Sequence, residues 1–211
     1  MDYNEKQAAI IETAEKLFSS SGFDGTSVRD IASGAGVNVA MISYYFGSKE
    51  KLMEAVMEHK YNRMRLKVEN LLQDEKMHPL QKIYMLIDDY VAKYIEQKNL
   101  QVIMMHEQLL AKRTPVSDMI MDLKKRNLES VSLLIQDGQK KGVFKKNIDI
   151  TLMMATMIGT VSQTVLSQNL YREFDKKMES LSDEAFREYL RKKTSIHLKK
   201  LFKAVLTYEA K

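Results

Sequence analysis

The sequence contains no cysteine among its 211 residues. Disulfide bonds, thiolate metal sites and cysteine nucleophiles are therefore excluded. The absence also fits a reducing compartment, so we expect a cytoplasmic location. Histidine is scarce too. The four histidines lie at positions 59, 78, 106 and 197, and this spacing is not that of metal ligands. We expect neither a metal site nor a cofactor.

Proline and glycine are also few, with two and eight residues respectively. Lys, Glu and Gln are frequent, and these residues favour helix. No run alternates polar and apolar residues for long enough to predict a sheet. The composition therefore predicts an all-α fold.

Long hydrophobic runs are missing as well. The most apolar stretch, residues 148–166, is interrupted by Asp149, several hydroxyl groups and Gln163. It predicts a buried helix, because a membrane span needs about 20 apolar residues. The N-terminal segment is charged and amphipathic and lacks the apolar core of a secretory signal. We expect no membrane partner.

Motifs of catalysis are lacking too. The pair His106-Glu107 is followed by Leu110, so it is not a zinc-binding HExxH motif. Gly34 and Gly36 lack the third glycine of a dinucleotide-binding loop. We therefore expect a protein that is not an enzyme.

The charge is unevenly distributed along the chain. The formal net charge is +5, yet residues 1–60 carry six Lys and Arg against nine Asp and Glu. The basic excess lies in the rest of the chain. The basic run at residues 191–200 fits a solvated helix face better than a membrane or nucleic-acid surface. A case for DNA binding must therefore rest on where individual residues lie.

The glycines divide the chain into two kinds of structure. Five of the eight fall within residues 22–47, between short segments of helical periodicity. We expect a head of three short helices over residues 1–47, a long bridging helix over 48–73 and a larger helical domain over 74–211. The further helices are expected over residues 79–96, 99–111, 115–140, 149–169 and 182–208, with a charged connector over 170–181.

The second and third short helices form a helix-turn-helix unit. Ser27 and Asp30 have the spacing of a capping box at the start of the second helix. Ala35 and Gly36 supply the small residues of the turn, and Asn38 is a good cap for the third helix. The third helix must fit a DNA groove about 12 Å wide, so small exposed residues at its start suit base contacts.

Three segments carry a resemblance to a known family. They are TSVRDIA (26–32), AGV (35–37) and SYYFGSKEKL (43–52), preceded by AEKLF in the first helix. In this order they resemble the DNA-binding signature of TetR/AcrR-type transcriptional regulators, over about residues 8–56. Ser43 departs from the family's common tyrosine, and Tyr45 from its common histidine. The resemblance implies a homodimeric repressor that binds palindromic half-sites of double-stranded operator DNA and is released by a small molecule.

The resemblance also implies roles in DNA binding for particular residues. The expected base contacts are Arg29, Asn38, Val39, Ala40 and Met41, and the expected phosphate contacts are Thr26, Ser27, Ser43, Tyr44, Tyr45 and Lys49. Arg29 is the candidate for a guanine contact, and the apolar residues suit thymine methyl groups and groove shape. Simpler roles stay open, because tyrosines at a helix end often pack and Thr26, Ser27 and Asn38 are also helix caps.

The resemblance places the dimer interface on the last two long helices. Small residues at near-helical spacing permit close helix contact, and the final helix is rich in apolar residues. The candidate interface residues are Ala155, Gly159, Ser162, Leu198, Leu201, Phe202 and Val205. Packing within one chain is the alternative.

A methionine-rich segment between these parts suggests an adaptable pocket for a small hydrophobic or amphipathic ligand. The candidate pocket residues are Tyr84, Asp88, Met105, His106, Glu107, Met153, Thr156, Met157 and Thr160. Methionine is equally an ordinary core residue. The competing function is a helical interaction scaffold that does not bind DNA sequence-specifically, and a gel-shift assay distinguishes the two.

Overall fold

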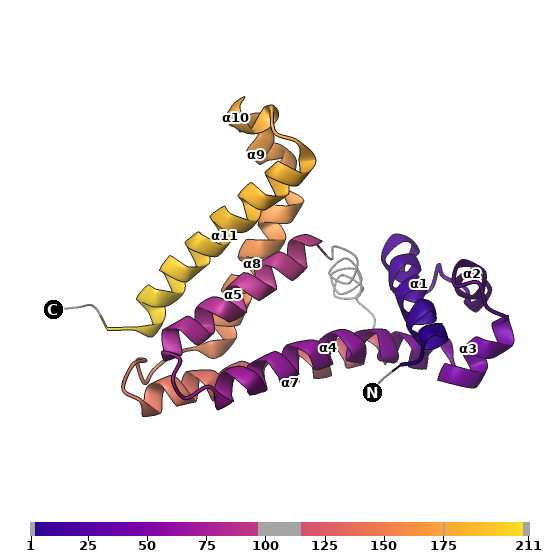
Figure 1. Cartoon of the computed structure of the whole chain (residues 1–211), viewed down its shortest axis with the longest axis horizontal. Coiled ribbons are helices and arrows are strands. Elements are labelled where there is room, and N and C mark those ends of the chain that lie inside the picture. Colours follow the sequence, from indigo (N-terminus) through magenta and orange to yellow (C-terminus); the bar gives the residue numbers. More distant parts are fainter. Residues whose placement is uncertain (1–2, 97–114, 175, 209–211) are drawn as a thin grey trace. The chain divides into compact units, whose positions relative to one another are not determined.

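The computed structural model describes residues 3–96, 115–174 and 176–208, and among them every regular element is a helix, which confirms the all-α prediction (Figure 1). The helices are α1 (Glu5–Ser21), α2 (Val28–Gly34), α3 (Val39–Phe46), α4 (Lys49–Gln73), α5 (Pro79–Glu96), α7 (Pro115–Lys140), α8 (Ile150–Leu166), α9 (Gln168–Phe174), α10 (Lys176–Glu179) and α11 (Asp183–Leu206). The helix expected over residues 99–111 lies outside the described residues.

The stretch expected as a charged connector is largely helical, so that prediction was wrong. Residues 168–174 form α9, and residues 176–179 form α10. Arg172 of α9 forms an ion pair with Asp183 at 2.6 Å, and its guanidinium lies 4.3 Å from the ring centroid of Phe186. These contacts fasten α9 to the start of α11, and they join residues at least 11 positions apart, where periodicity gives no information.

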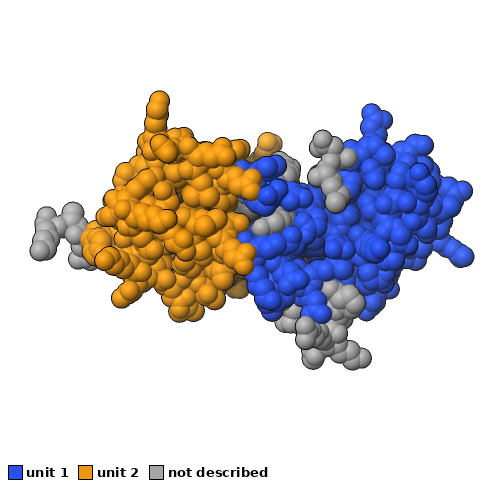
Figure 2. Space-filling view, turned by 90° about the horizontal axis from the view of Figure 1, so that it is seen from below, with its two compact units in different colours: residues 1–67, 97–127 blue, residues 68–96, 128–211 orange. Residues whose placement is uncertain are grey.

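The chain divides into two compact units (Figure 2). Unit 1 comprises residues 1–67 and 97–127, and unit 2 comprises residues 68–96 and 128–211. Both α4 and α7 therefore contribute residues to each unit. The domain limits expected at residues 47 and 73 stay predictions.

Unit 1 is built on a core shared by α1 to α4 and the first turns of α7. Its fully buried side chains include Ile10, Phe18, Ile31, Ile42 and Leu52. The residues of α7 that pack into this core are Val116, Ile120 and Leu123. Helices α2 and α3 are thus held by burial of apolar side chains, since helices of seven or eight residues are not stable alone.

Capping residues fix the ends of these helices. Asn4 and Gln7 form a reciprocal capping box at the start of α1, with distances of 2.9 and 3.0 Å. Ser27 and Asp30 form the expected capping box on α2. Gly22 follows α1 with a φ of 74°, in the region that favours glycine.

Unit 2 has a core formed by α5, α8 and α11. The buried residues include Val91 on α5, Val161 on α8, and Leu198 and Phe202 on α11. The end of α7 also packs closely, because a Cβ atom on Gly138 would lie 2.1 Å from the Phe144 ring. A larger residue at position 138 would therefore displace this ring.

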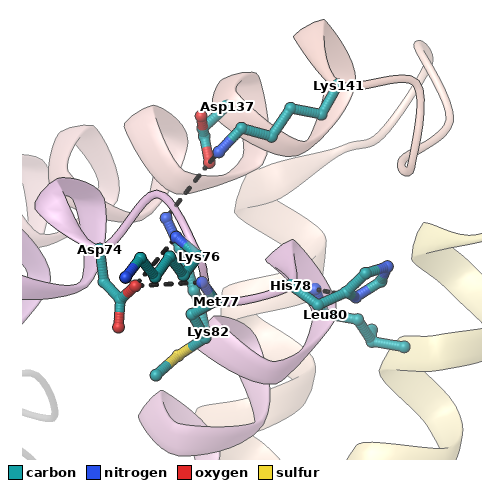
Figure 3. Close-up of polar contacts among 8 residues, drawn as sticks. All are labelled: Asp74, Lys76, Met77, His78, Leu80, Lys82, Asp137 and Lys141. Atoms are coloured by element: carbon teal, nitrogen blue, oxygen red, sulfur yellow. Dashed lines mark hydrogen bonds and ion pairs between the residues drawn. The ribbon is translucent and has the colours of Figure 1, made fainter.

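Polar contacts hold the α4–α5 turn and the start of α5 (Figure 3). The Asp74 carboxylate accepts hydrogen bonds from the backbone N–H groups of Lys76 and Met77, both at 3.0 Å. Within α5, the ammonium of Lys82 is 1% exposed and lies 3.5 Å from the carboxylate of Asp137 on α7. Burial of an ammonium is costly unless an acid partner remains beside it.

Candidate nucleic-acid interface

Helix α3 presents one buried face and one exposed face. Ile42 and Phe46 are buried in the core of unit 1. Val39, Ala40, Ser43 and Tyr44 are exposed, and Met41 is half-buried. The predicted base-contacting side chains of α3 therefore share an accessible helix surface with two of the predicted phosphate contacts.

Asn38 fixes where α3 begins. Its side-chain oxygen accepts a hydrogen bond from the backbone N–H of Ala40 at 2.9 Å, so Asn38 is the helix cap. The side chain is exposed, and among the described residues its amide N–H₂ group donates to no acceptor. Capping uses only the acceptor, so a donor contact with a base stays compatible with this geometry.

The start of α2 carries Arg29, whose side chain is exposed. The Ser27 hydroxyl lies 2.6 Å from the Asp30 carboxylate, to which it donates, and it also accepts from the Asp30 N–H at 3.2 Å. The hydrogen bond from the Ser27 side chain, with a second from its backbone, lowers the pKa of Asp30. Ser27 is thus exposed, but its hydroxyl already serves the cap.

Thr26 is placed inside the head, not on its surface. Its side chain is 3% exposed. The hydroxyl is positioned to donate to the carbonyl oxygens of Gly22 at 2.8 Å and Leu17 at 3.1 Å. These contacts close the connection between α1 and α2, and they leave no exposed hydroxyl for the expected phosphate contact.

Lys49 is also tied to this connection. Its ammonium donates to the carbonyl oxygens of Phe23 at 2.8 Å and Thr26 at 3.0 Å. It also lies 4.3 Å from the ring centroid of Phe23. An ammonium has three donors, so one remains for a phosphate after these two bonds. The structure therefore adds a structural role to the expected phosphate contact.

The adjacent tyrosines at the end of α3 differ in environment. Tyr44 is 83% exposed, whereas Tyr45 is half-buried and packs against the core of unit 1. Their rings meet edge to face with centroids 5.1 Å apart. The packing interpretation thus holds for Tyr45, while Tyr44 has a free hydroxyl end on the same surface as Val39 and Ala40.

Sequence reasoning missed Tyr3. Its ring lies 6.5 Å from the Phe46 ring and 5.7 Å from the His59 ring, measured between centroids. Tyr3 directly precedes Asn4, the cap of α1. An apolar residue just before a helix cap often packs back onto the helix, and this position was the available indication.

The expected ligand residues are only partly gathered. Met105, His106 and Glu107 lie outside the described residues. Met153 and Met157 are buried, whereas Thr156 is exposed and donates its hydroxyl proton to Leu152 at 2.8 Å. The Thr156 side chain therefore lies on a different face of α8 from the two methionines.

Two further ligand candidates lie on α5, and one on α8. The Asp88 carboxylate accepts hydrogen bonds from the Ser195 hydroxyl and from the Lys199 ammonium of α11. Tyr84 lies under the same ammonium, with 5.6 Å between the nitrogen and the ring centroid. These contacts join α5 to α11, so both side chains have structural partners. Thr160 is half-buried.

The expected dimer residues fall into two groups. Ala155, Gly159 and Val205 are exposed, and Ser162 and Leu201 are half-buried. Leu198 and Phe202 are 0% and 2% exposed inside unit 2, so they have no surface for contact with a second copy. In α11 the large apolar side chains that are exposed are those of Ile196 and Val205.

No single helix within the described ranges has the length and apolar character to cross a membrane. The pair α8 and α9 together passes on length and composition, but it bends by 64°. Across all of the described residues, no group of three or more His, Asp or Glu side chains could bind a metal ion.

Comparison with known proteins accounts for both parts of the chain. The family model for bacterial regulatory proteins of the tetR family matches residues 10–56. The model for the C-terminal region of YsiA-like protein matches residues 57–192. Together they cover the candidate interface and most of the helices that follow it.

Two curated relatives match mainly the N-terminal part. YttP of Bacillus subtilis (strain 168), described as a probable HTH-type transcriptional regulator, is 58% identical over 52 residues, which are 25% of this chain and 25% of that protein. The HTH-type transcriptional repressor NicS of Pseudomonas putida is 39% identical over 90 residues, 41% of this chain and 42% of that protein. The chain thus spans less than half the length of these relatives.

A solved structure matches over nearly the whole chain. The transcriptional regulator FadR from Bacillus subtilis, in complex with stearoyl-CoA, has a TM-score of 0.64 and 18% identity, covering 89% of this chain and 97% of that one. At this identity the likeness shows the fold alone.

Proposed function

The chain belongs to the tetR family of bacterial regulatory proteins, which are DNA-binding transcriptional regulators and not enzymes, and from this we propose a homodimeric repressor that a small molecule releases from its operator. The family match favours a regulator over an interaction scaffold. The observation that carries the DNA-reading part is the exposed surface of α3, where Val39, Ala40 and Tyr44 lie opposite the buried Ile42 and Phe46. A short helix with small residues at its start fits a major groove.

The surface of α8 supports the homodimer. This helix contains no charged residue over its 17 positions. Its exposed residues include Ala155 and Gly159, with Leu152 at 65% and Leu166 at 61% exposure. Exposed apolar surface of this kind marks interaction sites, and small residues let two helices approach closely. The proposed partner is a second copy, because a palindromic operator needs two heads.

The proposed ligand is apolar or amphipathic. Met153 and Met157 are buried in unit 2, and methionine adapts its shape to apolar guests. The stearoyl-CoA of the related FadR structure combines a long apolar chain with a polar end, and we extend that class of molecule to this chain. The ligand would lower operator affinity by favouring a state in which α4 holds the heads at another spacing.

A selection experiment tests the DNA-reading part. The full chain is incubated with random duplexes, and the bound DNA is recovered, sequenced and footprinted. We expect an inverted repeat whose half-site centres lie about 34 Å apart or further along the same face. Recovery of unrelated sequences, bound no better than the starting pool, would refute a sequence-specific repressor.

A variant of Gly159 tests the dimer. No atom outside its own helix lies within 4 Å of a Cβ placed at this position, so Gly159→Arg should fold as one chain. We expect light scattering to give a dimeric mass for the natural chain and a monomeric mass for the variant, with matching loss of affinity for the selected repeat. The exposed Gln136→Arg change on α7 is the matched control. A monomeric natural chain would contradict the homodimer.

Release is tested with a defined probe. Stearoyl-CoA is added to the complex between the chain and its selected duplex, with free CoA as the control. We expect the acyl compound, and not CoA, to raise the Kd for DNA. An unchanged Kd with both compounds would remove long acyl chains from the proposed ligand class.

A further inference from the structure

Tyr3 links two helices of unit 1 through its ring. It lies between Phe46, the last residue of α3, and His59 on α4, with centroid distances of 6.5 and 5.7 Å. The ring packs against the core cluster and is partly buried. Tyr3 therefore helps to set the position of the end of α3 against α4.

Glu58 connects this part of α4, next to His59, to α7. It precedes His59 on α4, and its carboxylate accepts a hydrogen bond from the guanidinium of Arg126. The side chains of Arg126 and Glu58 are 41% and 31% exposed. Such an accessible pair contributes little to overall stability, but a guanidinium–carboxylate contact is directional and can hold two helices in one orientation.

The ring of Tyr3 reaches the neighbour of Glu58, because His59 directly follows Glu58 on α4 and its ring lies 5.7 Å from the Tyr3 ring. Burial raises the pKa of the Tyr3 phenol, and the negative charge of Glu58 raises it further. The aromatic contact between Tyr3 and His59 thus lies one residue along α4 from the Arg126–Glu58 contact.

Aromatic contacts continue from Phe46 to the exposed end of α3. The Phe46 ring lies 6.4 Å from the Tyr45 ring, and Tyr45 lies 5.1 Å from Tyr44, both measured between centroids. Tyr44 is the most exposed of these residues and a candidate phosphate contact. A small displacement of Phe46 relative to α4 would therefore change where the Tyr44 hydroxyl lies.

We propose that Arg126, Glu58 and Tyr3 form a positioning relay in which the contact between α7 and α4 sets the orientation of α3 and thereby the affinity for DNA. The inference rests on the proposed function, in which α3 reads the operator. Arg126, Glu58 and Tyr3 act through Phe46 and are positioning residues. The relay gives α7 a route to α3 within unit 1, besides the covalent continuity of α4.

The test measures DNA affinity in charge-swapped variants of the full chain. The probe is the duplex that the natural chain selects from a random pool, at one fixed salt concentration. We expect Arg126→Glu and Glu58→Arg each to raise the Kd about 5- to 20-fold, which lies within the range of couplings between contacting residues. We expect the double variant to recover most of the affinity, because the swapped pair restores the contact. Lys125→Met, an exposed change next to Arg126, is the control.

Tyr3 variants test the second half of the relay. Tyr3→Phe keeps the ring and should keep the affinity, whereas Tyr3→Ala should weaken it to the level of Arg126→Glu. Adding Arg126→Glu to Tyr3→Ala should cause no further loss. The salt dependence of log Kd should stay unchanged in all variants, since these residues touch no phosphate. Melting temperatures, measured in parallel, should not follow the order of the Kd values.

The outcomes separate the two proposals. If the natural chain binds its duplex and each single variant has a Kd within twofold of the natural value, the relay is overturned and the repressor proposal stands. The same holds if the losses of affinity multiply in the double variants. Losses of affinity that follow the melting temperatures would reduce the three residues to a stability role and also overturn it. A natural chain that selects no duplex would overturn the repressor proposal and the relay with it.

Discussion

The ammonium of Lys49 donates a hydrogen bond to the carbonyl oxygen of Phe23 at 2.8 Å and lies over the ring of the same residue, 4.3 Å from its centroid. Lys49 is the first residue of α4, and Phe23 lies in the connection between α1 and α2. One side chain thus joins the long helix to the segment that precedes the helix-turn-helix. This contact and a phosphate contact are separate roles, and they can be measured separately.

The first prediction concerns Lys49→Met. Loss of two carbonyl hydrogen bonds and the ring contact should destabilise the chain by about 1–3 kcal/mol, measured by thermal unfolding. If the remaining donor also binds a phosphate, log Kd for DNA should depend less steeply on log salt, by about one unit per head. Lys51→Met, at an exposed position two residues later, is the control. An unchanged salt slope with lower stability would leave Lys49 only its structural role.

The second prediction concerns Arg29, which is exposed on α2. Arg29→Lys keeps the charge but loses the planar fork that binds guanine through two hydrogen bonds. We expect a loss of about 1–3 kcal/mol on the selected duplex and weaker discrimination at one base pair of each half-site. Binding to duplexes with every base at that position measures this. Equal losses on all four bases would assign Arg29 to phosphate, and Ser33→Ala on the same helix is the control.

The third prediction separates the two tyrosines. Tyr44→Phe removes a hydroxyl from a side chain that is 83% exposed, so the melting temperature should not change. DNA affinity should fall by about 1 kcal/mol if the hydroxyl donates to a phosphate. Tyr45→Phe is the matched change in a half-buried ring. If both variants bind DNA with the affinity of the natural chain, neither hydroxyl forms a hydrogen bond to a DNA phosphate.

The fourth prediction concerns the buried Lys82 and its partner Asp137. Burial would raise the pKa of the Asp137 carboxyl, but the hydrogen bond from Lys141 and the charge of Lys82 outweigh it, so the pKa lies below its ordinary value. Asp137→Asn leaves the Lys82 ammonium buried without an acid and should cost about 3 kcal/mol at neutral pH. Lys82→Met should cost less, because Lys141 still donates to Asp137 at 3.0 Å.

The pH dependence of this contribution has a definite sign. A carboxyl whose pKa is lower in the folded chain stabilises it above the unfolded pKa of about 3.9, and the stabilisation is lost as the pH falls through the folded value. The difference in unfolding free energy between the natural chain and Asp137→Asn should therefore shrink below about pH 4. Urea unfolding at a series of pH values measures it, and a difference independent of pH would exclude the carboxylate as its source.

Local features of the sequence were enough to predict the head. The capping box of Ser27 and Asp30, the cap at Asn38 and the breaks at Gly22 and Gly47 all act within four residues of their partners. Helix boundaries there could be predicted to within a residue or two. The helix over residues 168–174 could not, since Asp183 and Phe186 stabilise it from α11.

The interface residues show the same limit. That Val39 and Ala40 are exposed follows from the spacing of the buried Ile42 and Phe46 on one helix. That Thr26 is buried and Lys49 engaged does not, because the Lys49 ammonium binds carbonyl groups 23 and 26 residues away. From the sequence alone, a polar side chain is expected at the surface. Folding can instead place backbone acceptors beside it, as it does for Thr26 and Lys49.

The uncharged character of α8 separates two equilibria of the proposed repressor. DNA binding depends on displaced counterions and weakens steeply as salt rises. A contact made through Leu152, Ala155, Gly159 and Leu166 involves no ion on this helix, and burial of apolar surface is not weakened by salting-out ions. A rise in ionic strength would thus weaken DNA binding but not the contact between two copies of α8. If the salt concentration around it rose, the proposed dimer would dissociate from its operator but stay paired, so it could rebind without reassembling.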